Sequence, residues 1–306
     1  MSRKIPYVAP YLYYWGVWDK SSYKITSFTD CFEKAGLKEA TYAFLVSDDG
    51  KTMSRVIFDN FSKDITKFQS YGGKVTVSIG GASGTFLESV MTVDEEVDAL
   101  SEIVEKLKIK RFDWDVEGSV MNDKNFLSKV RQVAKKMLSK YDDLEITLTL
   151  SADYSTGLPS TSLQFVKDFI SETKYYPIVN PMLMIYGTGK NGSSYAITAL
   201  KLINAQLRAT YKLPTEENMW PYLSACPMIG KNDDNSLFSP ADMFNLAIFV
   251  GTNNLAGITF WALNRDQYTS TRFADGTDLN RFSYANTSDF EFSKNALLCK
   301  LQKLNF

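Results

Sequence analysis

The chain has 306 residues, of which 44% are hydrophobic and 23% are charged, and its formal net charge is −1. This composition is typical of a globular protein with a large core, and the balanced charge argues against nucleic acid or an anionic membrane as a partner. The chain has no histidine, which excludes Ser-His-Asp and Cys-His catalytic groups and histidine-ligated zinc.

Short apolar or β-branched runs alternate along the chain with longer segments of helical periodicity. The runs that predict strands cover residues 8–15, 40–46, 74–79, 111–117, 145–151, 178–186, 222–229 and 256–263. The segments that predict helices cover residues 26–36, 58–71, 91–108, 123–140, 161–173, 194–211, 240–253 and 289–303. The helix at 240–253 has the strongest start signal, with Ser239 as N-cap, Pro240 at the first position and Asp242 in the first turn.

This alternation predicts a fold of class α/β, with parallel strands connected by crossover helices. Eight such units can close into a (β/α)8 TIM barrel. Because no linker, repeat or low-complexity run interrupts the pattern, we expect a single domain over residues 1–306. An open doubly wound sheet is the alternative, although no GxGxxG sequence follows the first predicted strand.

Cysteine usage and apolar patterning add further expectations. Cys31, Cys226 and Cys299 lack CxxC spacing, so we expect buried free thiols, with one disulfide bridge as the alternative. No run of 18 apolar residues is present, and the first residues lack the apolar region of a signal peptide. Either the protein has no such peptide or the chain begins after it.

The stretch RFDWDVEG (111–118) carries three acids that alternate with apolar residues. In a strand, Asp113, Asp115 and Glu117 share one face and lie roughly 6 to 7 Å apart from one to the next. In a closed barrel this face is the interior, where neighbouring carboxyl groups raise one another's pKa. The alternative is a solvated face of an antiparallel strand. The surrounding alternation of strands and helices favours the barrel, with Glu117 at the carboxyl end of its strand, where such barrels carry out chemistry.

Four motifs resemble glycoside hydrolase family 18, the chitinases and their relatives. KRFDWDVEG (110–118) resembles the family's DxxDxDxE signature, and VTVSIGGASG (75–84) resembles its SxGG strand. MLMIYG (182–187) resembles its sixth-strand Met-x-Tyr, and GITFWALNRD (257–266) resembles its eighth strand. The motifs occur in the family's order, so the resemblance covers the whole chain and implies a bacterial-type catalytic barrel.

The resemblance implies a chitinase that cleaves β-1,4-linked N-acetylglucosamine with retention, using the substrate's own acetamido group as the nucleophile. In this mechanism Glu117 is the general acid and base, with a pKa above that of a free glutamate. Asp115 holds the acetamide N–H, and Asp113 shares a proton with Asp115. Tyr186 donates to the acetyl oxygen, and Trp261 forms an apolar floor under the sugar ring.

Further residues are candidates for substrate contact. Met184, Tyr11, Phe44 and Asn232 are assigned to substrate binding. Weaker candidates are Tyr13, Trp15, Trp18, Trp220 and Asp233, because single aromatic residues are more often core. Core packing is also the alternative for Met184, Tyr186 and Trp261. For Ser78, Gly80 and Gly81 we expect a structural role at the barrel mouth.

Two positions depart from the family pattern. Lys110 stands where the signature has its first aspartate, and we expect an altered charge balance beneath Asp113 without loss of activity. Ile185 stands where many relatives have aspartate, which affects one substrate hydrogen bond and the pH optimum.

Other functions remain as alternatives. An endo-β-N-acetylglucosaminidase acting on N-glycans would use the same acids, and some related barrels are lectins or inhibitors without catalysis. Three acids could also bind Mg²⁺, although side chains on one straight strand converge poorly on an octahedral ion. We therefore expect no metal or cofactor and a monomer. About ten residues, 230–239, separate the seventh strand from its helix, which predicts an open groove and endo-type cleavage. A chitin substrate would favour a secreted protein.

Overall fold

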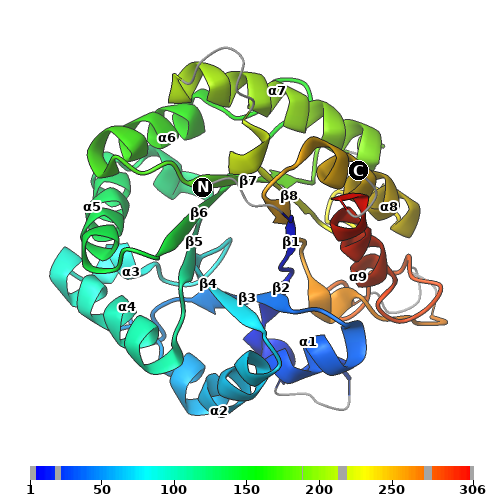
Figure 1. Cartoon of the computed structure of the whole chain (residues 1–306), viewed down its shortest axis with the longest axis horizontal. Helices are drawn as coiled ribbons and strands as arrows, with labels where there is room; N and C mark the ends of the chain where they lie inside the picture. Colours follow the sequence, from blue (N-terminus) through cyan, green and yellow to red (C-terminus); the bar gives the residue numbers. More distant parts are fainter. Residues whose placement is uncertain (1–4, 18–21, 188, 213–218, 272–277, 304–306) are drawn as a thin grey trace.

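The computed structural model describes residues 5–17, 22–187, 189–212, 219–271 and 278–303. Within these residues the chain forms a ring of parallel strands surrounded by helices (Figure 1). The strands are β1 (Tyr7–Val8), β2 (Tyr11–Tyr13), β3 (Glu39–Leu45), β4 (Lys74–Gly80), β5 (Arg111–Val116), β6 (Glu145–Ser151), β7 (Ile178–Leu183), β8 (Ser224–Pro227), β9 (Gly230–Lys231), β10 (Leu237–Phe238) and β11 (Gly257–Ile258). The helices are α1 (Phe28–Ala35), α2 (Val56–Ser70), α3 (Leu87–Val90), α4 (Val93–Leu107), α5 (Lys124–Lys140), α6 (Ser160–Thr173), α7 (Ser193–Tyr211), α8 (Pro240–Asn253) and α9 (Glu291–Ala296).

The predicted TIM barrel is confirmed, and residues 7–13 close it. The strand order is β1-β11-β8-β7-β6-β5-β4-β3-β2, so β1 pairs with the last strand and β2 pairs with β3. Pro10 lies between β1 and β2, and its carbonyl accepts the amide of Thr41 at 2.8 Å. On the other side, the Tyr11 amide donates to the Phe260 carbonyl at 3.1 Å. The interrupted segment 7–13 therefore forms backbone hydrogen bonds with the strands on both of its sides.

The predicted strands and helices are all found, but several bounds differ, and α3, β9 and β10 are not among the predicted elements. The predicted strands 178–186 and 222–229 are shortened to β7 and β8, so Met184 and Tyr186 follow β7. Three further differences concern the two ends of the chain. The first predicted strand, 8–15, is split by Pro10, which cannot donate to a ladder, and ends at Tyr13 where the 3-10 helix η1 (Tyr14–Val17) begins. The last predicted strand, 256–263, is shortened to β11, with an isolated bridge between Met228 and Trp261. The last predicted helix, 289–303, is α9 followed by the 3-10 helix η5 (Leu297–Lys303).

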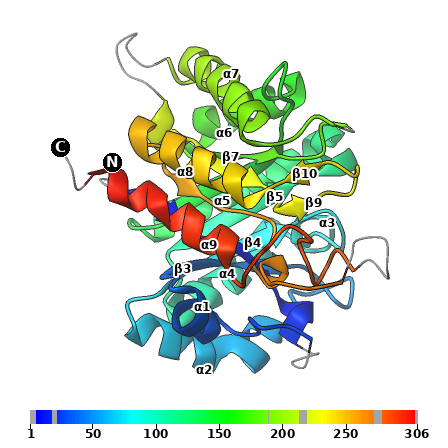
Figure 2. The same cartoon turned by 90° about the vertical axis from the view of Figure 1, so that its right-hand side faces the viewer.

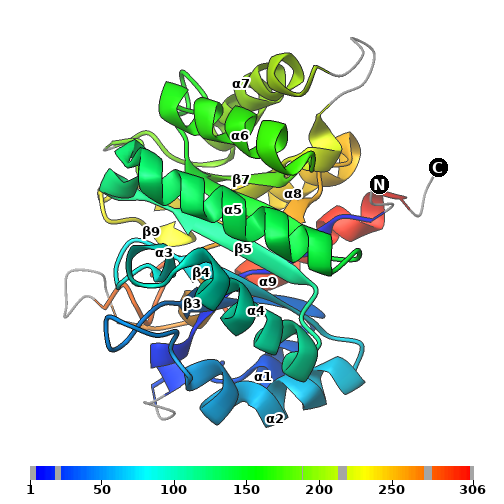
Figure 3. The same ribbon diagram turned by 90° about the vertical axis from the view of Figure 1, so that its left-hand side faces the viewer.

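The connection between β8 and α8 is short, as the sequence predicts. It contains the two-stranded hairpin of β9 and β10 and carries no inserted domain. Figures 2 and 3 show the barrel from two sides, with β9 at one end of the ring of strands. The helix α8 begins with the predicted cap, since the Ser239 side chain accepts from the Asp242 amide and Asp242 reciprocates.

Strand β5 shows the alternation on which the site depends. Phe112, Trp114 and Val116 are each at most 1% exposed and belong to the main core between strands and helices. Asp113 and Asp115, with opposite orientation, lie inside the ring. The prediction that the acids face a closed interior is therefore confirmed.

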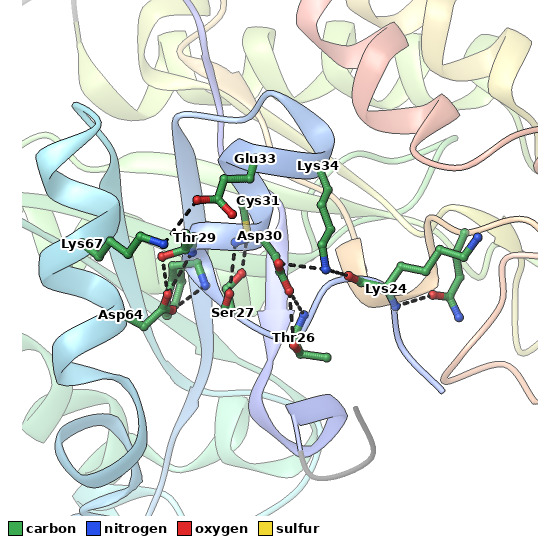
Figure 4. A network of polar contacts seen from close by, with 12 residues as sticks. Lys24, Thr26, Ser27, Thr29, Asp30, Cys31, Glu33, Lys34, Asp64 and Lys67 are labelled. Carbon is green, nitrogen blue, oxygen red and sulfur yellow. Dashed lines mark hydrogen bonds and ion pairs between the residues drawn. The ribbon is translucent and has the colours of Figure 1, made fainter. Parts of the chain in front are cut away.

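Polar contacts fix the outer helices α1 and α2 to each other (Figure 4). Asp64 of α2 accepts the amide of Phe28 at 2.6 Å and that of Thr29 at 3.0 Å, and both amides belong to the first turn of α1. Ser27 caps the same turn by accepting from the Asp30 amide. A carboxylate at a helix N-terminus satisfies amides that have no partner within the helix.

Two sequence expectations concern the chain as a whole. Cys31, Cys226 and Cys299 are buried free thiols, as predicted. Among the described helices, none has the length and apolar character that a membrane span requires.

Candidate active site

The acids of β5 run from the barrel interior to its open end. Asp113 and Asp115 are only 2% and 4% exposed. Glu117 follows the strand and is half-buried. Gly118, with φ of 67°, then turns the chain into the 3-10 helix η2 (Gly118–Asn122). Because a positive φ is unfavourable for most residues, a glycine at this position lets the chain turn directly after Glu117.

Three hydroxyl groups hold Asp113. Ser78 of β4 and Tyr11 of β2 donate to its Oδ2 at 2.7 and 2.9 Å. Thr149 of β6 donates to its Oδ1 at 2.7 Å. Burial raises the pKa of Asp113 to about 6, and the three hydroxyl donors oppose this rise. The carboxyl is therefore ionised at neutral pH.

Asp115 and Glu117 form a hydrogen-bonded pair above it. Burial, followed by the charges of Glu117 and Asp113, raises the pKa of Asp115 well above its ordinary value. Burial also raises the pKa of Glu117, while its hydrogen bond to Asp115 lowers it. Asp115 therefore holds the proton that the pair shares. Its Oδ1 is buried and has no hydrogen-bond partner among the described residues.

A cleft of about 480 Å³ opens above the acids. Asp115 and Glu117 lie on the wall of this cleft, and the cleft connects them to the outer surface. The other residues that line the cleft are Tyr11, Trp15, Phe44, Ala82, Ser83, Thr149, Ser151, Ala152, Met182, Met184, Ile185, Cys226, Met228, Asp233, Trp261 and Asn280. The volume lies within the range of small-molecule sites.

Aromatic rings form one side of the cleft. Trp261 stacks on Phe44 with ring centroids 5.6 Å apart and an interplanar angle of 10°. Trp15 lies 6.2 Å from Trp261 and is 38% exposed, so it extends the aromatic surface outward. Flat apolar faces of this kind pack against the C–H surface of a sugar ring.

Residues after β7 also contribute to the cleft. Met184 is partly buried and lines it, whereas Tyr186 is not among its lining residues. The Tyr186 hydroxyl is buried without a hydrogen-bond partner among the described residues, and its ring packs edge-on against Tyr154 at 5.7 Å. Burial, with smaller contributions from Asp153 and Cys226, raises the pKa of Tyr186, so its hydroxyl stays protonated. This group can donate one hydrogen bond.

Ile185 occupies an unusual backbone conformation at the cleft. Its φ is 56°, which is rare for a β-branched residue, and its side chain is 47% exposed. The side chain lines the cleft, where it presents an apolar surface instead of the carboxylate expected from the family resemblance.

Glycines allow the close packing at the mouth of the barrel that the sequence predicts. A Cβ on Gly80 would lie 2.4 Å from the Asp115 carbonyl oxygen, and one on Gly81 would lie 2.7 Å from the Phe44 ring. Ser78 does more than this expectation stated, because its hydroxyl donates to Asp113.

Several sequence candidates lie away from the cleft surface. Tyr13 is fully buried, and Trp220 packs edge-on against Phe249. Asn232 is 0% exposed, and its amide donates to two backbone carbonyls, whereas the neighbouring Asp233 lines the cleft. Trp18 lies outside the described residues.

Lys110 lies directly before β5 and does not face Asp113. Its side chain is 68% exposed and forms an ion pair with Asp143 on the outside of the barrel. The cation inside the barrel below Asp113 is Arg111, which forms an ion pair with Glu145 at 2.6 Å. The alternation of the strand explains the difference, because Lys110 and Asp113 have opposite parity.

Sequence reasoning missed Thr149, Asn180 and Cys226 as residues of the site. Thr149 lies opposite Asp115 in the β5–β6 register, and Asn180 lies opposite Thr149 in the next pair of strands. A signal was present, since small polar residues at every second position of neighbouring strands indicate a polar interior.

The fold and the cleft define a (β/α)8 barrel with a buried row of acids at its open end. No family model matches the chain. Endochitinase 11 of Metarhizium anisopliae is 26% identical over an alignment of 246 residues that covers 74% of this chain and 47% of that protein. A probable bifunctional chitinase/lysozyme of Escherichia coli (strain K12) is 27% identical over 250 residues, with 74% and 28% covered. The chain thus spans half or less of these relatives.

The catalytic domain of a hyperthermophilic chitinase from Pyrococcus furiosus has the same fold. Its TM-score is 0.85 at 21% identity, with 100% of this chain and 98% of that chain covered. The catalytic domain of a family GH18 chitinase from a fern, Peteris ryukyuensis, has a TM-score of 0.63 at 14% identity, with 95% of this chain and 98% of that chain covered. The resemblance that the four motifs indicate is confirmed: the chain is similar in sequence to chitinases and in fold to chitinase domains that include one of family GH18.

Proposed function

We propose that this chain is a chitinase, a glycoside hydrolase that cleaves β-1,4-linked N-acetylglucosamine with retention by a substrate-assisted mechanism. The observation that carries the proposal is the buried acidic row, whose last member, Glu117, opens into a cleft with an aromatic side. The similar proteins named as chitinases support the same activity.

Glu117 acts as the general acid and then as the base. A retaining glycosidase usually needs a second carboxylate as nucleophile, but here the acetamido oxygen of the substrate takes that part. Glu117 protonates the leaving glycosidic oxygen while the acetamido oxygen attacks the anomeric carbon and forms an oxazolinium ion. Glu117 then removes a proton from the water that opens this ring. The proton comes from the pair: it moves from Asp115 to Glu117 along their hydrogen bond, so Glu117 acts as the acid and Asp115 is left ionised.

Asp115 and Tyr186 orient the acetamido group. The unpartnered Oδ1 of Asp115 accepts the acetamide N–H and stabilises the positive charge of the oxazolinium ion. The Tyr186 hydroxyl donates to the acetyl oxygen. Asp113 lies beneath Asp115 and, as an ionised carboxylate, keeps the shared proton on its neighbour.

The aromatic residues bind the sugar chain. Trp261 forms the floor under the reacting ring, and the neighbouring rings of Phe44 and Trp15 extend this aromatic surface. The short β8–α8 connection adds no wall to the cleft, so we expect an open groove and endo-type cleavage. The cleft is built within one chain, so a monomer suffices for the reaction.

The test compares the wild-type chain with Glu117→Gln on a fluorogenic chitotrioside and on its fully deacetylated analogue. We expect the variant to lose at least about 10³-fold in kcat/KM, and the deacetylated substrate to stay uncleaved by either protein. Chelator should not change the activity. The matched control is Glu96→Gln, a buried glutamate outside the cleft. Equal turnover of the deacetylated substrate would exclude substrate assistance, and full activity of Glu117→Gln would exclude the assigned acid.

A further inference from the structure

A second polar layer lies in the barrel next to Asp113, with Asn180 of β7 at its centre. The Asn180 side chain is completely buried. Its Nδ2 donates to Thr149 Oγ1 at 2.9 Å and to Tyr11 Oη at 3.2 Å. Its Oδ1 accepts from Ser224 Oγ at 2.6 Å and from Thr259 Oγ1 at 3.0 Å. The amide thus uses both of its donors and both lone pairs.

The ionised carboxylate of Asp113 is the acceptor that directs the hydroxyl protons of this layer. An ionised carboxylate only accepts, so Asp113 takes a hydroxyl proton from Tyr11 and another from Thr149. The two hydroxyl oxygens also lie 2.9 Å apart, so either hydroxyl has the other as an alternative acceptor. While both protons point at Asp113, each hydroxyl offers only lone pairs to Asn180. The group that meets these lone pairs must be a double donor, which the amide Nδ2 is and a carboxylate or an apolar side chain is not.

We propose that Asn180 is a positioning residue that fixes the hydroxyl protons of Tyr11 and Thr149 on Asp113, so that Asp113 stays ionised and the proton of the row remains on Asp115 beside Glu117. The inference rests on the proposed function for its catalytic meaning. Asn180 does not line the cleft and acts only through its two neighbours.

Other charges around Asp113 do not replace this effect. The titratable and charged groups that surround it in the described structure are Tyr11 from β2, Arg111 and Asp115 from β5, Glu117 after that strand, and Cys226 from β8. Arg111 is committed to its ion pair with Glu145. Burial keeps both the Tyr11 hydroxyl and the Cys226 thiol protonated, because it raises their pKa values. The hydroxyl donors are therefore the groups that oppose protonation of Asp113.

The experiment follows Asp113 directly, by a pH titration of its ¹³Cγ chemical shift in protein labelled at aspartate. The Asp113 signal is assigned by its loss in Asp113→Asn. We expect Asn180→Leu, which removes the two N–H donors, to raise the titration midpoint of Asp113 by about one pH unit or more, a tenfold change in proton affinity. The low-pH limb of kcat/KM on a chitotrioside should move in the same direction.

Two further variants make the test decisive. Ser224→Ala removes a hydroxyl from the same layer but keeps both Asn180 donors, so the Asp113 midpoint should stay within about 0.3 units of the wild type. If Asn180→Leu does not fold, as thermal denaturation would show, Asn180→Ala serves instead, because it also removes both N–H donors and adds no charge beside Asp113.

The outcomes separate the two proposals. An unchanged midpoint in the Asn180 variant, or an equal shift in Ser224→Ala, would overturn the positioning role even if the wild-type chain cleaves chitotrioside. Conversely, a wild-type chain that cleaves no chito-oligosaccharide would overturn the proposed function, while the midpoints would still report what Asn180 does to Asp113.

Discussion

A cluster of buried carboxyl groups lies on each of the two sides of strand β5. Inside the barrel lies the row of Asp113, Asp115 and Glu117. Outside, Glu88 of α3 and Glu96 of α4 are 2% and 0% exposed and hydrogen-bond to each other. In both clusters burial is the main cause of raised pKa values. By titration behaviour alone, either cluster could be taken for an active site.

Access and compensation separate the two clusters. Trp114 donates its indole N–H to Glu88 at 2.8 Å, and the nearby Lys129 ammonium lowers the pKa of both glutamates. Glu88 and Glu96 are closed off from solvent, whereas Glu117 of the inner row is half-buried and lines a cleft. A raised pKa therefore indicates burial alone. A catalytic role also requires that substrate can reach the carboxyl group and that one of its oxygens has no hydrogen-bond partner within the protein.

After the Glu117 substitution, replacing Asp115 by asparagine should give the largest effect on kcat/KM. We expect Asp115→Asn to lose about 10² to 10³-fold in kcat/KM, because the charge that stabilises the oxazolinium ion is removed. Its thermal stability at pH 7 should rise. A carboxyl with a raised pKa stabilises the folded state below its unfolded pKa, and this contribution is lost as the pH rises toward the folded value. Calorimetry checks the rise in thermal stability, and kinetics checks the loss of kcat/KM. A variant that loses stability and keeps activity would assign Asp115 a purely structural role.

Removing the hydroxyl of Tyr186, which follows β7, should lower kcat/KM less than the Asp115 substitution does. We expect Tyr186→Phe to lose about tenfold in kcat/KM on chitotrioside, equivalent to about 1.4 kcal/mol of transition-state binding. Because the hydroxyl has no partner among the described residues, the melting temperature should not fall. Tyr154→Phe is the matched control, since Tyr154 contacts the same ring. Equal losses in both variants would indicate a packing effect.

Neutralising the outer pair should change stability and leave the reaction intact. We expect Glu96→Gln to keep kcat/KM within about threefold of the wild type, because Glu96 does not line the cleft. Its melting temperature should exceed that of the wild type above neutral pH and match it near pH 4. The wild-type pair stabilises the fold while protonated and loses this contribution as the pH rises. A large loss of activity would remove the distinction between the two clusters.

The smallest effect is expected at Lys110, on the outer surface at the start of the strand. Lys110→Ala removes an exposed ion pair with Asp143, and such pairs contribute little to stability. We expect kcat/KM within about twofold and a melting temperature within about one degree of the wild type. A shift of the activity profile with pH would instead connect this charge to the inner row.

The sequence predicts the barrel because periodicity reports which faces of strands and helices are buried. It also predicts the acids of the site, because Asp113, Asp115 and Glu117 share one strand and one parity. It does not predict Asn180 or Thr149 as their neighbours, since contacts between strands depend on register. Asn232 illustrates the opposite error. A polar residue after a strand resembles a binding residue, but its amide here satisfies the backbone of its own turn.

The divided first strand has a consequence for how the chain folds. Residues 7–13 pair with Thr41 on one side and with residues near 257–260 on the other, a separation of about 250 residues along the chain. Until the last strand arrives, β1 has an unsatisfied backbone edge, and the cleft lacks Trp261. Closure therefore depends on contacts of high sequence separation, which form slowly, and the ability to bind sugar should appear only at the final step of folding.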